Sequence, residues 1–258
     1  MPFFCNRKTF GRAGLPVGEN GFSFSDMMFV LHFADNRYSF YNKTQYKEKN
    51  MKYSYLGQRI PKEARKELNE KIIHLVTSNQ AEAAGITRED IYNAYTGDGG
   101  LHGLHMADFD NYAEFSKAKK GIENGQVFSP HSVCQFLMAC LDINKQELVT
   151  DLTCGMGNFF NFAPVEENIY GCEIDPKAYK VAHYLYPKAN LERGDIRNYE
   201  SPMKMDYSVG NPPFNLAFNF QNESILSQLY FCQKSAQVLK PLGIMAIIVP
   251  MSFLADTF

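Results

Sequence analysis

No apolar run in the 258-residue sequence reaches the ~18–20 residues that a membrane-spanning helix requires. The amino terminus, Met-Pro-Phe-Phe-Cys-Asn-Arg-Lys, also lacks the charged, apolar and small-residue order of a signal peptide. The six cysteines contain no Cys-x-x-Cys pair, and several fall inside apolar strand or helix patterns. These absences predict a cytoplasmic protein with no membrane partner, whose cysteines are buried thiols.

The chain also lacks the excess of positive charge that is typical of DNA-binding domains, because its net charge is −2. The charge is unevenly distributed: residues 1–120 hold 17 Lys and Arg against 14 Asp and Glu, and residues 121–258 hold 9 against 14. Within 37–71, ten basic residues are interleaved with aromatic ones, namely Tyr38, Phe40, Tyr41, Tyr46, Tyr53 and Tyr55. Such a mixture can follow a nucleic-acid backbone and stack on bases. A solvated helix face with ordinary core tyrosines gives the same pattern.

The sequence of residues 1–120 predicts a mainly helical amino-terminal region, in which the first 25 residues are irregular. Pro61 opens a helical pattern that continues to about residue 79. Thr87 is expected to cap a short helix, with Asp90 in place of the usual Glu of a capping box. A further helix is expected over about 108–124.

Residues 121–258 predict alternating strands and helices after an apolar helix over 131–142. The expected strands are 148–153, 168–174, 190–194, 205–210 and 243–250, and the expected helices are a short one from 157, then 176–186 and 223–239. This alternation predicts an α/β domain with a doubly wound, Rossmann-like parallel sheet.

The most informative stretch is Asn211-Pro212-Pro213-Phe214, which follows the strand expected over 205–210. Two consecutive prolines remove two backbone donors and fix φ twice, so this stretch is a rigid turn rather than a helix or a central strand. The carboxyl end of a parallel strand is where open α/β sheets bind their ligands. The amide side chain, the carbonyl groups and the aromatic ring of this turn suit an amino group on a flat ring.

Three other strand ends carry residues suited to a nucleoside. Asp151-x-x-x-Gly155-x-Gly157 is a glycine turn whose small residues let the backbone approach a ligand closely. Glu173 ends the next strand, where a carboxylate can accept two ribose hydroxyls, whereas Asp175 is expected to cap the following helix. Asp195 ends the third strand, where it can accept an adenine amino group while Ile196 lies against the ring.

Together with Phe128-Ser129-Pro130 upstream, these elements resemble the N6-adenine DNA methyltransferases whose cofactor motifs precede the recognition domain, notably the modification subunits of type I restriction systems. The resemblance covers about residues 120–253, with all elements in the family's order. In that family the Phe-Ser-Pro position, where Thr is commoner than Ser, packs over the methionine end of S-adenosylmethionine. Residues 99–125 are also similar to methyltransferase-like proteins of conjugative elements.

The resemblance implies a class I S-adenosylmethionine-dependent methyltransferase domain at 121–258 that methylates the N6 amino group of adenine in DNA, in a restriction–modification or mobile-element setting. The expected catalytic residues are Asn211, Pro212, Pro213 and Phe214. The expected contacts of S-adenosylmethionine are Phe128, Ser129, Pro130, Asp151, Thr153, Gly155, Gly157, Asn158, Glu173, Ile174, Asp195, Ile196 and Asn211. No metal is expected, because His102 and His105 have ligand-like spacing but no Cys or Glu partner.

The expected chemistry follows from the substrate. The lone pair of adenine N6 is delocalised into the ring, so the amino group is a weak nucleophile. Hydrogen bonds from its N–H groups to the Asn211 side-chain oxygen and the Pro212 carbonyl favour a pyramidal nitrogen whose lone pair faces the sulfonium methyl. Phe214 stacks on the base, which first has to leave the duplex.

Two alternatives share part of this pattern. Release-factor glutamine methyltransferases and some ribosomal RNA methyltransferases use the same Asn-Pro-Pro turn on other planar amino groups, although the glutamine enzymes usually carry Tyr at the position of Phe214. A cofactor-binding fragment without catalytic activity is the second alternative, and the presence of Asn211 and Glu173 argues against it.

The end of the sheet gives a further expectation. Only eight residues follow the strand expected over 243–250, whereas this fold normally closes with a reversed β-hairpin and, in the resembled family, a recognition domain comes next. An unpaired apolar edge is something that natural sheets avoid. The sequence therefore predicts the amino-terminal part of a longer protein, with a missing domain or subunit that recognises the DNA sequence.

Overall fold

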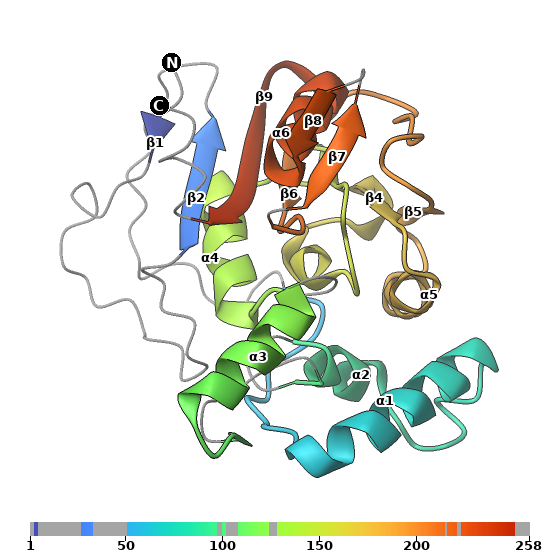
Figure 1. Cartoon of the computed structure of the whole chain (residues 1–258). Coiled ribbons are helices and arrows are strands. Elements are labelled where there is room, and N and C mark those ends of the chain that lie inside the picture. The colour runs from blue at the N-terminus through green and yellow to red at the C-terminus, as the bar shows by residue number, and fades with distance from the viewer. Residues whose placement is uncertain are drawn as a thin grey trace.

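The computed structural model describes residues 3–4, 27–32, 51–96, 100–101, 108–123, 128–214, 216–220 and 223–250. Its central feature is a sheet with the strand order β1-β2-β9-β6-β3-β4-β5 (Figure 1). These strands are β1 (Phe3–Phe4), β2 (Met27–His32), β3 (Val149–Asp151), β4 (Ile169–Glu173), β5 (Asn190–Arg193), β6 (Met205–Gly210) and β9 (Leu239–Pro250). The five strands from β9 to β5 are parallel to one another, which confirms the predicted doubly wound sheet.

Helices cover both faces of this sheet. The described helices are α1 (Lys62–Thr77), α2 (Arg88–Ala94), α3 (Tyr112–Glu123), α4 (His131–Leu141), α5 (Pro176–Leu185) and α6 (Ser227–Val238), with short 3-10 helices η2 (Asn158–Phe162) and η3 (Glu166–Asn168). Successive residues of a strand point to opposite faces. In β9, Ala246 and Ile248 accordingly belong to the main core with α4 and α5, whereas Ile247 packs on the opposite face.

Several predicted helix ends are confirmed. The Thr87 hydroxyl accepts the Asp90 N–H at 3.1 Å, and the Asp90 carboxylate accepts the Thr87 N–H at 2.9 Å. This reciprocal pair is a capping box in which Asp replaces Glu. The Asp175 carboxylate accepts the N–H groups of Lys177 and Ala178 at 2.8 Å, so it caps α5 as expected.

Two expectations about the carboxyl-terminal part are wrong. Residues 223–226 form strand β8 (Glu223–Leu226), which pairs antiparallel with β7 (Ala217–Phe220), and helix α6 starts only at Ser227. Four residues are too few for periodicity to separate a strand from the first turn of a helix, and pairing with β7 decides the outcome. Strand β9 also begins earlier than expected, at Leu239.

The expected unpaired edge of the sheet is also wrong. Strand β2 pairs antiparallel with β9 over its whole length, from Met27 opposite Pro250 to His32 opposite Met245, and β1 pairs with β2. A reversed pair of strands therefore covers β9, but it comes from the amino-terminal side of the sequence. This pairing removes the physical reason for expecting an uncovered edge.

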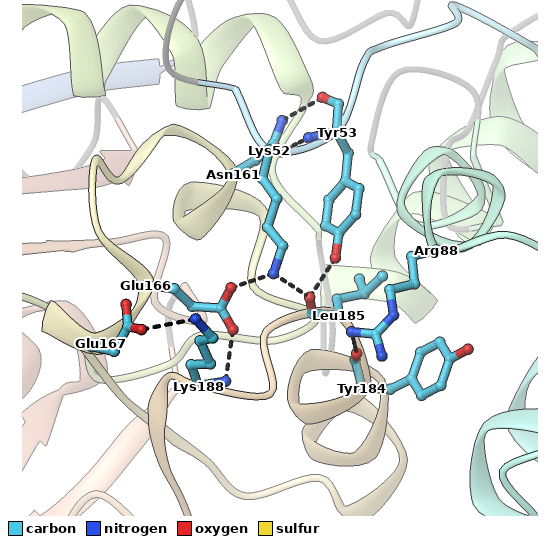
Figure 2. A network of polar contacts seen from close by, with 9 residues as sticks. All are labelled: Lys52, Tyr53, Arg88, Asn161, Glu166, Glu167, Tyr184, Leu185 and Lys188. Carbon is cyan, nitrogen blue, oxygen red and sulfur yellow. Dashed lines mark hydrogen bonds and ion pairs between the residues drawn. The ribbon is translucent and has the colours of Figure 1, made fainter.

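Residues 51–96 of the predicted amino-terminal region pack against the sheet domain through a shared core. Figure 2 shows one attachment, in which Asn161 accepts the Lys52 N–H through its backbone and the Tyr53 N–H through its side chain, at 3.0 and 2.7 Å. The Tyr53 hydroxyl donates to the Leu185 carbonyl, and Arg88 donates to the Tyr184 carbonyl at 2.7 Å. The domain boundary at residue 120 stays a prediction.

These contacts bear on the basic and aromatic stretch 37–71. The Tyr53 ring is buried, and the Tyr55 ring stacks on His131 with 4.5 Å between ring centroids. Both rings therefore pack within the protein, which agrees with their interpretation as core tyrosines. The other four aromatic residues of the stretch lie outside the described residues.

Within the described ranges, no helix is both long and apolar enough to cross a bilayer. No three His, Cys, Asp or Glu side chains in these ranges gather as metal ligands. His102 and His105 lie outside those ranges. The described cysteines form no disulfide, and burial raises the pKa of the Cys172 thiol to about 12.

Candidate active site

A cavity of about 290 Å³ lies beside the carboxyl ends of β3, β4, β5 and β6. The strand order reverses between β3 and β6, which is the place where doubly wound sheets bind ligands. The cavity is lined by Phe128, Leu152, Thr153, Gly155, Cys172, Glu173, Ile174, Ala178, Gly194, Asp195, Ile196, Arg197, Asn211, Pro212, Pro213, Phe214, Leu216 and Phe231. The fold thus brings most of the predicted site residues together from sequence positions between 128 and 214.

The glycine turn after β3 forms one wall. Gly155 has φ of 55°, a left-handed conformation that favours glycine, and a Cβ at this position would lie 3.1 Å from the Phe128 ring. Its N–H donates to the Glu173 carboxylate at 2.7 Å. The Phe128 ring, the turn and the end of β4 are therefore held together.

Glu173 is the buried acid of this wall, with 8% of its surface exposed. Its second carboxylate oxygen accepts the Asp175 N–H at 2.8 Å. Burial raises the pKa of Glu173, although the hydrogen bonds from these backbone N–H groups oppose that change. Two backbone donors thus fix the orientation of a carboxylate that faces the cavity, while the neighbouring Ile174 side chain is largely exposed.

Asp195 lies at the next strand end and pairs with a residue that the sequence analysis did not select. Its carboxylate accepts the Arg197 N–H at 2.9 Å and also bonds the Arg197 guanidinium. The hydrogen bonds from Arg197 lower the pKa of Asp195. Ile196, between the two, is buried and lines the cavity.

The Asn211-Pro212-Pro213-Phe214 turn forms the opposite wall, where β6 ends. The Asn211 side-chain oxygen is buried and has no hydrogen-bond partner among the described residues. A buried acceptor without a donor costs about 1–3 kcal/mol of free energy, and in the wall of a cavity a donor on a ligand can satisfy it. The Pro213 carbonyl, in contrast, accepts the Ser227 hydroxyl at 2.7 Å.

Five predicted cofactor contacts do not line the cavity, namely Ser129, Pro130, Asp151, Gly157 and Asn158. The Asn158 amide donates to the carbonyls of Ser129 and Tyr95, at 2.9 and 3.2 Å, and therefore supports the loop that carries Phe128. Packing explains why residue 157 is a glycine, because a Cβ there would lie 2.7 Å from the Tyr186 ring. Contact of these five residues with a cofactor stays a prediction.

Pro130 and Asp151 also have defined structural roles beside the cavity. Pro130 precedes the first residue of α4, where its fixed φ suits a helix start. Asp151 accepts the Thr153 N–H at 2.9 Å, and a Cβ at Gly210 would lie 3.1 Å from its carboxylate oxygen. Burial raises the pKa of Asp151 to about 7.

The sequence analysis missed seven residues of the cavity wall, which are Leu152, Cys172, Ala178, Gly194, Arg197, Leu216 and Phe231. Those next to a selected strand end, such as Arg197 beside Asp195, could have been found by widening each motif by two residues. Phe231 could not, because it reaches the cavity from α6 only through a core cluster that it shares with Leu152 and Cys172.

Comparisons with known proteins point to one family. The family model described as N-6 DNA Methylase matches residues 110–255. The type II restriction enzyme and methyltransferase RM.BcgI of Heyndrickxia coagulans is 28% identical over 168 residues, which are 55% of this chain and 26% of the relative. The chain thus spans about a quarter of that relative's length.

Two solved structures are similar at lower identity. A putative class I S-adenosylmethionine-dependent methyltransferase from Listeria monocytogenes has a TM-score of 0.46 at 16% identity, covering 76% of each chain. A type I restriction-modification methyltransferase subunit from Streptococcus thermophilus has a TM-score of 0.43 at 15% identity, covering 70% of this chain and 55% of its own.

Proposed function

Because the chain belongs to the N-6 DNA methylase family, we propose that it transfers a methyl group from S-adenosylmethionine to the N6 amino group of adenine in DNA. The observation that carries this proposal is the buried Asn211 side-chain oxygen, an acceptor without a donor in the wall of a cavity. The name of the relative, both restriction enzyme and methyltransferase, supports a restriction–modification setting.

The residues of the first wall suit S-adenosylmethionine. The Glu173 carboxylate, oriented by two backbone donors, is proposed to accept the ribose hydroxyls. Asp195 is proposed to accept the adenine amino group of the cofactor, with Ile174 and Ile196 against the ring. Phe128 and Gly155 form the adjoining surface, where a flat contact with the methionine end fits. When bound, the cofactor supplies an electrophilic methyl group on a sulfonium.

The residues of the second wall suit the target amino group. Asn211 and the Pro212 carbonyl are proposed to accept its two N–H bonds, which orients the nitrogen lone pair toward the first wall. Phe214 is proposed to stack on the target base. Nitrogen gains the methyl group as the carbon–sulfur bond breaks, and the extra proton on nitrogen leaves to solvent. No ionised base is needed, so an amide at Asn211 is sufficient.

Nucleoside mass spectrometry tests this proposal. The protein is incubated with methyl-labelled S-adenosylmethionine and, in separate reactions, with DNA lacking N6-methyladenine, with RNA, and with a release-factor protein. We expect labelled N6-methyladenine from the DNA and none from the protein that carries Asn211→Ala. Label in RNA nucleosides or glutamine instead would contradict the proposed substrate.

A further inference from the structure

The β7–β8 hairpin is closed at its base by one buried residue. Ser227, the first residue of α6, has no exposed surface. Its N–H donates to the Leu216 carbonyl at 2.7 Å, and its hydroxyl oxygen accepts the Leu216 N–H at 3.3 Å. These two bonds join the residues that flank the hairpin, so the hairpin leaves and re-enters the fold at one fixed point.

The same hydroxyl reaches the turn proposed to be catalytic. It donates to the Pro213 carbonyl at 2.7 Å. The Gln228 side-chain oxygen lies 3.1 Å from the hydroxyl oxygen, but a hydroxyl carries only one hydrogen. The shorter distance assigns that hydrogen to Pro213, and the hydroxyl oxygen then accepts the Leu216 N–H.

This bond fixes a degree of freedom that the prolines leave open. The rings of Pro212 and Pro213 set φ at both positions but not ψ. The ψ angle of Pro213 determines where its carbonyl points and therefore the direction in which Phe214 leaves the turn. A buried donor on the Pro213 carbonyl selects one value of this angle. It also occupies that carbonyl, which leaves Asn211 and the Pro212 carbonyl as the acceptors for an amino group.

We propose that Ser227 is a positioning residue for methyl transfer, acting through the Pro213 carbonyl to hold Phe214 and Asn211 in their working orientation. This inference rests on the proposed function. It predicts that loss of the hydroxyl slows transfer without weakening cofactor binding, because the contacts of Ser227 are with the turn and with the base of the hairpin.

A matched control exists on the same helix. The Ser235 hydroxyl is also buried, and it bonds the Ser208 hydroxyl of β6 at 2.9 Å. Ser235→Ala therefore removes one buried hydroxyl from α6, as Ser227→Ala does, but it leaves the turn untouched. Both variants are compared at a temperature where unfolding curves show each to be fully folded.

The test combines three measurements on the full chain. In Ser227→Ala we expect single-turnover methyl transfer to adenine at saturating cofactor to fall about tenfold or more, and the Kd of S-adenosylmethionine to stay within about threefold. Amide hydrogen exchange of Asn211 and Phe214 should accelerate by about tenfold. These two N–H groups report on the turn, because Pro212 and Pro213 have no amide, whereas the Leu216 N–H loses its own acceptor in this variant and is left out of the comparison. Ser235→Ala should leave all three unchanged.

The outcomes separate the two proposals. Equal exchange of the Asn211 and Phe214 amides in the two variants would overturn the positioning role, whatever the substrate is. Faster exchange with an unchanged transfer rate would also overturn it, because the hydroxyl would then hold the turn without serving the reaction. A wild-type protein that transfers nothing to adenine contradicts the proposed function, and the exchange comparison still decides what Ser227 does.

Discussion

The two walls of the cavity differ in how their polar groups are satisfied. At the ends of β4 and β5, the two acids that line the cavity have partners from the protein: Glu173 from Gly155 and Asp175, and Asp195 from Arg197. At the end of β6, the Asn211 side-chain oxygen is buried and has none among the described residues. One wall is a rigid surface with oriented acceptors, whereas the other contains a buried acceptor that a ligand donor could satisfy.

This difference explains why the two walls suit different partners. Fixed carboxylates suit the proposed cofactor, which is the same in every turnover, because a rigid surface reduces the entropy lost on binding. An unsatisfied acceptor discriminates strongly between ligands, because only a ligand with an N–H at that position forms a hydrogen bond with it. The wall at β6 is therefore where substrate choice is expected to reside.

Asn211→Ala is expected to abolish transfer while leaving the first wall intact. Loss of the acceptor should lower the rate by about a thousandfold or more, because the contact matters in the transition state. The Kd of S-adenosylmethionine, measured by calorimetry, should stay within about threefold. Asn211→Asp keeps an acceptor oxygen at the same place and should retain far more activity than the alanine variant. Equal rates in both variants would show that the oxygen is not what matters.

Glu173→Gln should have the opposite profile. The new amide group has to face either the Gly155 N–H or the Asp175 N–H, where it cannot accept, so one bond is lost together with the charge. We expect S-adenosylmethionine to bind more weakly by roughly 1–3 kcal/mol. Glu192→Gln, at an exposed position of the neighbouring strand β5, serves as the control. If both variants bind the cofactor as the wild type does, Glu173 has no role in holding it.

Asp151 lies between the two walls and gives a pH-dependent test. Burial raises its pKa to about 7 in the folded protein, whereas an unfolded Asp has a pKa of about 4. Between these values the folded state holds a proton that the unfolded state has lost, so this group lowers stability as pH rises and adds no further change above about pH 7. Asp151→Asn cannot ionise and keeps an acceptor for Thr153.

Urea unfolding at pH 5 and pH 8 measures this effect. The stability of Asp151→Asn relative to the wild type should be greater at pH 8 than at pH 5 by roughly 1–3 kcal/mol. Glu173, whose pKa burial also raises, contributes a slope of the same sign to both proteins. If the stability difference between Asp151→Asn and the wild type is the same at both pH values, Asp151 is ionised throughout this range.

Sequence patterns predicted the positions that follow from strand order. Glu173, Asp195 and Asn211 were found because each ends a parallel strand, and parallel strands bring their carboxyl ends to one edge. The contact of Gly157 with Tyr186 could not be predicted, because a glycine turn looks the same in sequence whether it packs against a ligand or against a ring. The amide of Asn158 bonds carbonyls that are distant in sequence, which no local pattern reveals.

Local sequence was sufficient to predict the alternation of elements, the rigid Asn-Pro-Pro-Phe turn and the caps of α2 and α5. Each of these features depends on dihedral restriction or on hydrogen bonds within a few residues. Tertiary structure decided what lies next to them. Only long-range pairing put β2 along β9, and only the packing of α6 brought Ser227 to the Pro213 carbonyl. Such contacts join residues separated by a hairpin or by most of the chain, and their free energy depends on the whole fold rather than on neighbouring residues.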